Sequence, residues 1–256
     1  MTLASPPSGL LTMAVGRRTA ALGRFAGGGS AVVIGAGTMR TLLLILAMVL
    51  LAAAPVMAAD TPIEAAPGNA APNDPAAGSP RASIVKFYDA LLEVMKTAKQ
   101  LGFGGRAERL APVIDATFDM REMTRLTLGS AGKSLTAEQF DQLVESFRRY
   151  TVASYADNFD DYNGERFVVG EARQAAGGQT VVPSKLVFAG NNPPVSLDYV
   201  MRQSEGRWGI TDIFAEGSVS QVAMRRSEFV SLLRREGYDT LLKTIETKTA
   251  ALATKG

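Results

Sequence analysis

Apolar residues recur every three or four positions from Ile84 onward, a spacing that places them on one face of an α-helix. This stripe predicts an amphipathic helix that ends at the turn around Gly102, where glycines gather. A shorter helix is expected from Leu110 to Ala116. The folded part of the chain therefore begins with helices.

Two further predicted helices start with capping signals. Asp119 is followed three residues later by Glu122, which predicts a capping box in which each side chain bonds the backbone N–H of the other residue. Gly129 ends this helix. Thr136 and Gln139 form the same pattern at the start of the longest predicted helix.

At Gly164 the apolar spacing changes to a period of two, which is typical of strands. The strand-like runs cover residues 165–172, 179–188, 195–203 and 207–216. Because short turns rich in glycine or proline separate the runs, successive strands are expected to pair antiparallel. Pro183 has no N–H for a sheet hydrogen bond, which predicts either an edge strand or a bulge at this position.

Helical spacing returns after Gly217 and is interrupted at Gly237. The order of elements is thus helices, an antiparallel sheet, and helices again. We therefore predict an α+β domain in which a curved, cone-like four-strand meander is covered by N- and C-terminal amphipathic helices. Such a fold can enclose an apolar cavity, although a bulky apolar residue taken singly is more often part of a solid core.

The chain before this domain has the composition of an export signal and a linker. Arg40 precedes an apolar run that ends at Pro55, and small residues follow it, which is the pattern of a signal peptide. An uncleaved membrane anchor is the alternative, but the run is shorter than the roughly 20 residues that span a bilayer. We assign residues 1–38 to a mis-called N-terminal extension, 39–59 to a cleavable signal peptide, 60–80 to a disordered Pro- and Ala-rich linker, and 81–256 to the folded domain.

Charge and composition narrow the function of the exported part. Residues 1–59 contain four arginines and no acidic residue, so 23 basic and 25 acidic residues remain, a net charge of −2. A nearly neutral chain does not favour nucleic acid as a partner. The protein has no cysteine and no histidine, which removes disulfides, the commonest metal ligand and the usual general base. We expect no catalytic residue, no metal site and no cofactor.

Charged residues in the predicted elements are the remaining candidates for chemistry. An acid that points into an apolar cavity can act as a base with a raised pKa. Asp198 and Asp212 each have apolar neighbours in the sequence, so if those neighbours face inward both acids face outward. The pairs Arg225–Arg226 and Arg234–Arg235 are candidates for contact with an acidic partner or a lipid phosphate, or else belong to solvated helix faces.

Several short motifs, taken in order, resemble one known family. The stretch 118–129 begins with Phe118-Asp119 and ends with Leu128-Gly129, as does the segment that opens the MlaC family, also called the toluene-tolerance family. Further similar motifs are Thr136-Ala137-Glu138-Gln139, Phe147-Arg148-Arg149-Tyr150, Ser154-Tyr155-Ala156, Leu197-Asp198-Tyr199, Trp208-Gly209-Ile210-Thr211-Asp212, Glu216-Gly217 and Arg226-Ser227-Glu228-Phe229. The resemblance implies a periplasmic carrier that ferries phospholipid between outer- and inner-membrane complexes.

One departure from the family pattern indicates a branch. After Glu216-Gly217 the chain is one residue longer than usual, and it lacks the family's Asn-Tyr pair before the arginine. This form, together with Lys99-Gln100-Leu101-Gly102 and the segment 150–155, is similar to the branch named HpnM, which is found with hopanoid-synthesis genes. The resemblance therefore implies either a hopanoid or a phospholipid as the bound lipid.

The family design implies that the apolar part of the lipid lies between sheet and helices while the polar head stays near the mouth. The implied partners are an inner-membrane transporter complex of the ABC type and an outer-membrane lipoprotein or porin complex. The candidate lipid-binding residues, chosen because they lie on facing predicted elements, are Met123, Leu126, Phe147, Tyr155, Phe159, Val187, Leu197, Tyr199, Ile210, Ile213, Phe214 and Val219.

Two other classes of function stay open. An isomerase or hydrolase on this fold would need a buried Asp or Tyr with a perturbed pKa in the cavity. A structural adaptor of the envelope would have a filled core and an exposed apolar patch in place of a cavity.

Overall fold

The computed structural model describes residues 78–254. The assignments of residues 1–38 to an extension, of 39–59 to a signal peptide and of most of 60–80 to a linker lie outside the described residues.

Two helices open the domain. Helix α2 (Pro80–Lys96) starts one residue before the expected boundary, because the Ser79 side chain caps it with a 3.1 Å hydrogen bond from a backbone N–H of the first turn. It ends well before Gly102, where the sequence predicted its end. Gly102 instead interrupts helix α3 (Ala98–Thr117) with a φ of 60°, a conformation that suits glycine. The helix expected at 110–116 is therefore the last part of a longer one.

Helices α4 (Met120–Leu128) and α5 (Ala137–Asn158) follow, joined by a 3₁₀ turn (Gly129–Ser134). The capping box at the start of α5 is confirmed. Thr136 Oγ1 accepts a hydrogen bond from the Gln139 backbone N–H at 3.1 Å, and Gln139 Oε1 accepts one from the Thr136 N–H at 3.0 Å. This start sets the direction of the longest unbroken helix of the described chain.

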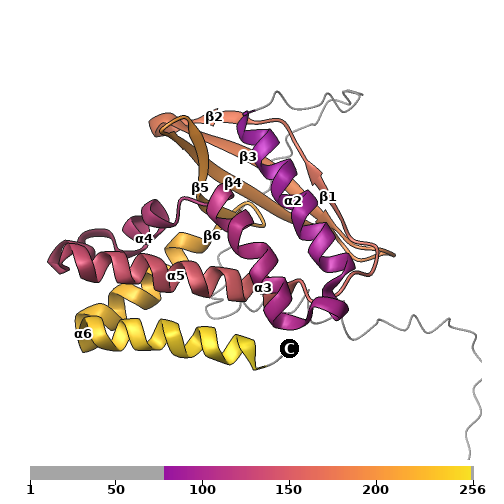
Figure 1. Ribbon diagram of the computed structural model, residues 1–256. Coiled ribbons are helices and arrows are strands. Elements are labelled where there is room, and N and C mark those ends of the chain that lie inside the picture. The colour runs from indigo at the N-terminus through magenta and orange to yellow at the C-terminus, as the bar shows by residue number, and fades with distance from the viewer. Residues whose placement is uncertain (1–77, 255–256) are drawn as a thin grey trace, which may run out of the picture. The chain divides into compact units, whose positions relative to one another are not determined.

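The sheet is antiparallel, with strand order β1-β3-β4-β5-β6, and β2 also pairs with β3 (Figure 1). The strands are β1 (Arg166–Val169), β2 (Arg173–Ala175), β3 (Gln179–Val187), β4 (Val195–Ser204), β5 (Arg207–Ala215) and β6 (Val219–Ser220). The predicted α+β class and antiparallel meander are confirmed. The sheet has more than the four predicted strands. Only β1 lies within the first predicted run, 165–172, whereas β2 lies just beyond that run, and neither β2 nor β6 was expected.

The split between β1 and β2 lies opposite Pro183, in the middle of β3. The Gly170 N–H donates to the Pro183 carbonyl at 2.8 Å, and a Cβ atom on Gly170 would meet the proline ring at 3.0 Å. Strand β3 is an interior strand, so the proline occupies an irregular position and not an edge. The edge alternative is therefore wrong. Pro183 faces the interruption between β1 and β2, while its pairing with Asp198 of β4 is in regular register.

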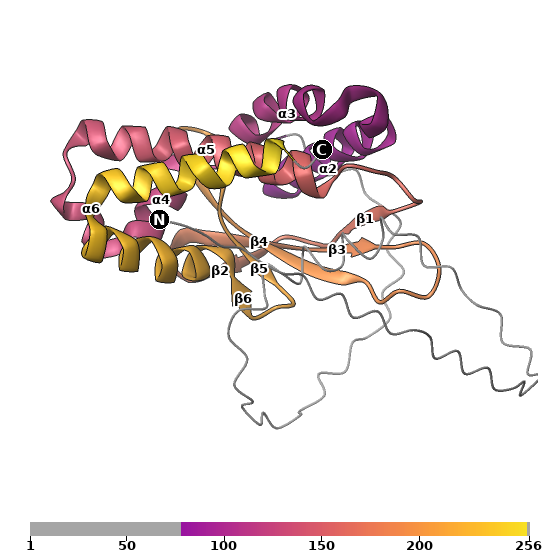
Figure 2. The same ribbon diagram turned by 90° about the horizontal axis from the view of Figure 1, so that it is seen from below.

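Helix α6 (Gln221–Ala253) closes the chain and is interrupted at Gly237, as the sequence predicted, with a φ of 84°. Figure 2 shows that the helices lie on one side of the sheet, with α2 and α3 over one part and α5 and α6 over another. The largest fully buried side chains include Ile84, Phe87, Leu91, Leu143, Tyr199, Met201 and Ile210. The core therefore lies between the inner face of the sheet and the helices that cover it.

Candidate functional site

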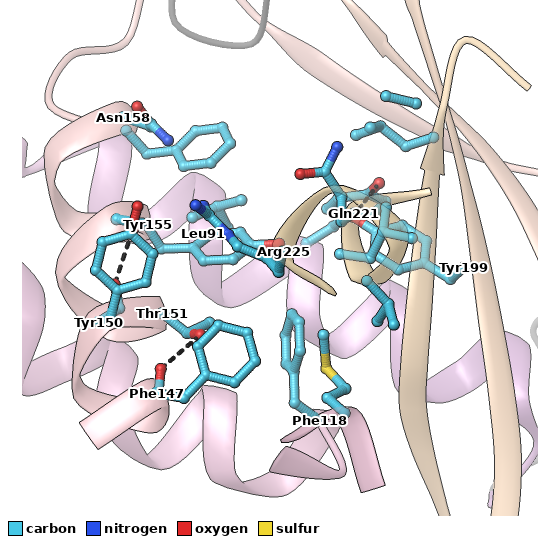
Figure 3. Close-up of a pocket in the computed structure, with 18 of the residues that line it drawn as sticks. Leu91, Phe118, Phe147, Tyr150, Thr151, Tyr155, Asn158, Tyr199, Gln221 and Arg225 are labelled. Atoms are coloured by element: carbon cyan, nitrogen blue, oxygen red, sulfur yellow. Dashed lines mark hydrogen bonds between the residues drawn. The ribbon is translucent and has the colours of Figure 1, made fainter. Parts of the chain in front are cut away.

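A cavity of about 130 Å³ lies in this core, between helices α2, α5 and α6 and strands β4 and β5 (Figure 3). Apolar and aromatic side chains form most of its wall. One water molecule needs only about 10–15 Å³ of such space, so the cavity is large enough for part of an organic ligand. An apolar wall favours a ligand that is itself apolar.

Helix α5 contributes one continuous face to the cavity. Residues three and four positions apart lie on the same side of a helix. The α5 residues of the wall follow this spacing and are Phe147, Tyr150, Thr151, Ser154, Tyr155 and Asn158. This face therefore brings small polar groups into the cavity beside aromatic rings.

Four hydroxyl groups from four elements meet at the core side of the wall, and we call Tyr88, Tyr155, Ser184 and Tyr199 the hydroxyl cluster. The Tyr88 hydroxyl forms a 2.9 Å hydrogen bond with that of Tyr199 and lies 2.7 Å from Ser184 Oγ. Ser184 Oγ donates to the carbonyl oxygen of Leu197 at 2.8 Å. A hydrogen bond also links Tyr155 to Tyr199. The cluster is thus a short chain of hydroxyls inside an otherwise apolar region.

Burial sets the protonation of these tyrosines. It raises the pKa of Tyr88 to about 12, while hydrogen bonds with Ser184 and Tyr199 act in the opposite direction. Burial also raises the pKa of Tyr155 and the pKa of Tyr199 above the ordinary value for tyrosine. All three hydroxyls are therefore protonated at neutral pH, and they act as hydrogen-bonding groups and not as bases.

A positive charge reaches the wall from α6, and we call Arg225, Tyr150 and Glu228 the arginine site. The Arg225 side chain is 14% exposed, and its guanidinium lies 4.8 Å from the centre of the Tyr150 ring. An Arg225 nitrogen lies 3.8 Å from the Glu228 carboxylate, which also pairs with Lys248. Since Glu228 divides its charge between two cations, Arg225 is only partly neutralised.

The sequence of this domain matches a known protein family. Residues 86–247 match the family described as MlaC protein. The match covers more than half of the sequence. The chain belongs to the MlaC family.

A solved structure with a similar fold is that of the phospholipid-binding protein from Ralstonia solanacearum in complex with a phospholipid. The similarity has a TM-score of 0.56 and a sequence identity of 23%, and it covers 68% of this chain and 98% of that chain. At this identity the similarity establishes a common fold and no more. A comparison with curated protein sequences finds no match.

The cavity of this MlaC-family protein includes many of the residues that the sequence suggested. The predicted residues that line it are Met123, Phe147, Tyr155, Phe159, Leu197, Tyr199 and Ile213. The tertiary structure thus brings α4, α5, β4 and β5 together around one space. That these side chains contact a lipid stays a prediction.

Two predicted lining residues point to the other face of the sheet. Val187 follows the fully buried Leu186 in β3, and Phe214 follows Ile213, which lines the cavity. Because successive side chains of a strand alternate between faces, neither Val187 nor Phe214 reaches the cavity. Ile213 and Phe214 were both predicted to line the cavity, but side chains alternate between the faces of a strand, so only one of two successive residues can line it.

Three other predicted residues lie near the cavity but do not line it. Ile210 is fully buried, and its backbone pairs with the segment that enters α4. Leu126 packs partly buried against the core, and its carbonyl oxygen accepts hydrogen bonds from Arg226 of α6. Val219 belongs to β6, the short strand that the sequence did not predict, where it pairs with Ala215. Each of these three therefore supports the elements around the cavity.

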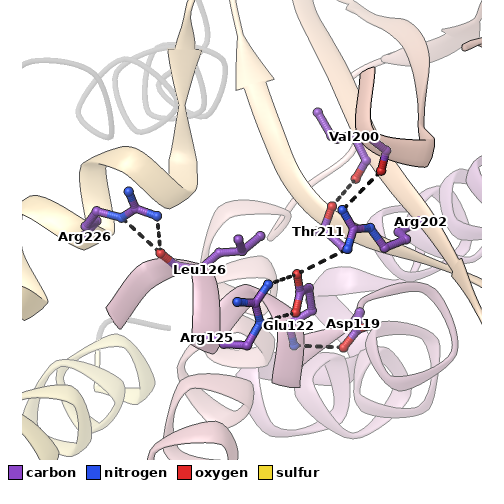
Figure 4. A network of polar contacts seen from close by, with 9 residues as sticks. Asp119, Glu122, Arg125, Leu126, Val200, Arg202, Thr211 and Arg226 are labelled. Carbon is purple, nitrogen blue, oxygen red and sulfur yellow. Dashed lines mark hydrogen bonds and ion pairs between the residues drawn. The ribbon is translucent and has the colours of Figure 1, made fainter. Parts of the chain in front are cut away.

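The polar network around α4 corrects a further prediction (Figure 4). Asp119 Oδ1 accepts from the Glu122 N–H at 2.9 Å, but the Asp119 N–H donates to the Ile210 carbonyl at 3.0 Å. Glu122 instead accepts from Arg125 at 2.6 and 2.5 Å, which lowers the pKa of Glu122. The expected capping box is thus wrong in one half, because the sheet uses the backbone donor that the pattern assigned to Glu122.

Sequence reasoning missed other residues of the wall. These are Tyr88, Leu91, Phe118, Tyr150, Thr151, Ser154, Asn158, Phe167, Ala215, Gln221 and Val222. Arg225, which the sequence named as a candidate for contact with a lipid phosphate, also lies on the wall. The α5 members share the helical spacing of Phe147 and Tyr155, so a count along that helix would have found them. Tyr88 and Leu91 stood in the predicted apolar stripe of the first helix, but a stripe alone cannot separate a packed core from the wall of a cavity.

Both strand aspartates lie off the cavity, as alternation predicts. Asp198 forms a 3.1 Å ion pair with Arg173. Asp212 accepts from the Val222 N–H at 3.0 Å and from Ser220 Oγ at 2.6 Å, so it stabilises the start of α6. Neither carboxylate is positioned to act on a molecule in the cavity.

Two features are absent from residues 78–254. Over this part of the chain, no cluster of three or more metal-ligating side chains occurs. In the same part, no helix is both long enough and apolar enough to cross a membrane.

Proposed function

We propose that this MlaC-family protein is a lipid carrier, which holds the apolar part of one lipid in the cavity between sheet and helices. The observation that carries the proposal is the largely apolar cavity with a cation on its wall. Family membership supports it, and so does the shared fold of the Ralstonia solanacearum protein that binds a phospholipid.

The cargo in this proposal is a phospholipid or a hopanoid. Apolar chains or rings fill the cavity, and Arg225 meets a phosphate or another polar head group at its edge. A cavity of about 130 Å³ is close in size to one that holds benzene, so the lipid-bound state must be wider than the present one. A glycine interrupts both α3 and α6, at Gly102 and Gly237, and since α6 lines the cavity we propose that α6 moves about Gly237.

The setting of this proposal is the periplasm, where the carrier moves lipid between complexes of the inner and the outer membrane. Burial of hydrocarbon contributes about 0.8 kcal/mol per methylene, so release of a long chain into water would be slow. Transfer therefore requires a docked partner that opens the cavity. The signal-like segment 39–59 and the family support this location.

The alternatives fit the geometry less well. The three tyrosines of the hydroxyl cluster have perturbed pKa values, as an isomerase or hydrolase would need, but the shift keeps them protonated and deprives them of the role of base. Both strand aspartates are engaged elsewhere. An adaptor with a filled core would not have the cavity, so the carrier function is the one we propose.

The test is mass spectrometry of an organic extract. The whole chain is expressed in a hopanoid-producing host, purified without detergent, extracted and analysed. We expect stoichiometric phospholipid or hopanoid, and the mass identifies which of the two is bound. A folded protein with no lipid would contradict the carrier function.

A pair of variants ties the lipid to this cavity. Leu197→Trp adds bulk on the cavity face of β4, whereas Phe214→Trp adds it on the opposite face of the neighbouring strand. We expect Leu197→Trp to lose bound lipid while far-UV circular dichroism stays that of a folded protein. Phe214→Trp keeps its lipid. Equal lipid content in both variants would place the lipid elsewhere.

A further inference from the structure

We propose that the hydroxyl cluster recognises one uncharged oxygen of the bound molecule, a hydroxyl or a carbonyl, through the hydroxyl of Tyr155. This inference rests on the proposed function, because it requires that the cavity hold an apolar ligand. It adds a rule of selection: among ligands of equal hydrocarbon content, the cavity prefers one that has a single polar oxygen within its apolar part.

The cluster has an anchored end and a free end. At the anchored end Ser184 Oγ donates to the Leu197 carbonyl at 2.8 Å and lies 2.7 Å from the Tyr88 hydroxyl. Tyr88 lies 2.9 Å from Tyr199, which in turn bonds Tyr155. Within the described chain, the Tyr155 hydroxyl has no protein partner beyond the cluster. Tyr155 is therefore the end that faces a ligand.

Counting hydrogens shows what this end can offer. Each hydroxyl has one hydrogen and turns about its C–O bond. When the hydrogens run from Tyr88 toward Tyr199 and on to Tyr155, the Tyr155 hydrogen is left free to donate. When they run the other way, Tyr155 donates to Tyr199 and its oxygen is free to accept. Ser184 has one hydrogen, so only the second arrangement satisfies both of its contacts, with Tyr88 donating to Ser184 and Ser184 donating to the Leu197 carbonyl. The chain therefore favours a ligand hydroxyl that donates to Tyr155, and it bonds a ligand carbonyl only when one contact of Ser184 is given up.

The surroundings make this end selective. Tyr155 packs edge-on against Phe87 and Phe118 and stacks on Phe159, with ring centres 5.5 to 5.7 Å apart. Aromatic rings thus hold the hydroxyl in place and keep other polar groups away from it. In such surroundings, a ligand that displaces water from a polar group and supplies no hydrogen-bond partner binds at a cost in free energy. A hydrocarbon ligand would impose that cost, and a ligand with a matching oxygen would not.

The experiment compares ligands that differ by one oxygen. Phosphatidylcholine vesicles are prepared with equal amounts of cholestanol and cholestane and of 1-hexadecanol and hexadecane, so that a ring system and a single chain are both offered. The whole protein is incubated with the vesicles and separated from them, and the ratio of alcohol to hydrocarbon in its extract is measured by mass spectrometry. The variant is Tyr155→Phe, and Tyr162→Phe is the control, since Tyr162 lies exposed outside the cavity.

We expect Tyr155→Phe to lower the ratio of alcohol to hydrocarbon in at least one pair about tenfold relative to the wild type, as the loss of one buried hydrogen bond predicts. Tyr162→Phe keeps the wild-type ratio. Comparing protein with protein cancels the unequal partition of alcohol and hydrocarbon into the vesicle.

The outcomes separate the two claims. Suppose that the wild type takes up phosphatidylcholine or a probe and that Tyr155→Phe leaves the ratio of alcohol to hydrocarbon unchanged. This result overturns the recognition by Tyr155 and leaves the carrier function standing. Wild-type protein that takes up no lipid at all overturns both. Should Tyr155→Phe fail to fold, Tyr88→Phe interrupts the same chain one step inward and is expected to lower the ratio in the same direction. An unchanged ratio in that variant also overturns the inference.

Discussion

The cavity wall has two polar regions, and they are built in different ways. The hydroxyl cluster consists of neutral groups that bond one another, and its members Tyr88 and Tyr199 are almost fully buried. The arginine site holds a charge, keeps part of it in solvent, and covers the guanidinium with the ring of Tyr150.

The contrast illustrates how polar groups are tolerated in apolar surroundings. A neutral hydroxyl can be buried completely when neighbouring hydroxyls satisfy it. A guanidinium cannot lose its charge, so it needs favourable partners, and Arg225 has partial exposure, an ion pair and an aromatic face. We therefore expect the hydroxyl cluster to contribute chiefly to folding and selection, and the arginine site chiefly to attraction of a charged head group.

The largest expected effect is on the free energy of unfolding, and it tests whether the hydroxyl cluster contributes more to folding than the arginine site does. Tyr199→Ala removes a ring that is 1% exposed and packs against Phe87 and Tyr88, and we expect it to lower the free energy of unfolding by about 3–5 kcal/mol. Arg225→Ala is expected to cost about 1 kcal/mol or less, because the side chain keeps contact with solvent. Urea unfolding followed by circular dichroism measures both values. Equal losses would remove the distinction between the two regions.

The second effect is a dependence of stability on pH that belongs to the hydroxyl cluster. The pKa of Tyr88 is about 12 in the folded protein and 10.0 ordinarily, so between these values the unfolded chain has lost a proton that the folded protein keeps. The contribution is complete below about pH 10 and is lost as pH rises through 12. We expect the wild type to lose about 2 kcal/mol more than Tyr88→Phe between pH 9 and pH 12. The measurement is guanidinium unfolding at a series of pH values, followed by Trp208 fluorescence. An equal loss of stability in both proteins would contradict the prediction.

The smallest expected effect concerns the charge of the arginine site. Arg225→Gln is expected to weaken binding of phosphatidylglycerol about tenfold and to leave binding of cholestanol unchanged, since only the former offers an anion. The control is Arg234→Gln, which removes an exposed arginine of the same helix. Uptake from vesicles of stated composition measures all three proteins. An equal decrease for both ligands would assign Arg225 a structural role in place of head-group recognition.

Much of this fold could be predicted from local patterns. Apolar spacing and the signals at Thr136, Gly129 and Gly237 correspond to real starts, ends and breaks of helices. The change of period at Gly164 correctly marks the passage to strands. The capping box at Asp119 was predicted wrongly in one half because of a contact with a distant strand. The Asp119 N–H donates to the Ile210 carbonyl and not to the Glu122 side chain.

The candidate site was predicted only in part, because the sequence shows which face of an element is buried but not which buried residues line a cavity. A stripe of apolar residues identifies the buried side of an element, which is why Met123, Phe147 and Leu197 were found. The polar residues Thr151 and Ser154 of the wall carry no such signal. For Arg225 the sequence left open a phosphate contact or a solvated helix face, and only the packing of the helices placed it on the wall.

Four properties follow from the amino-acid sequence alone: the class of the fold, the antiparallel pairing, the family, and the outward direction of Asp198 and Asp212. Each depends on spacing along a single segment or on motifs in order. Packing of the elements against one another sets two further properties: the space that remains between the sheet and the helices, and the hydroxyls that meet there. Those properties depend on how side chains from α2, α5, β3 and β4 fill a shared volume, and no pattern within one segment contains that information.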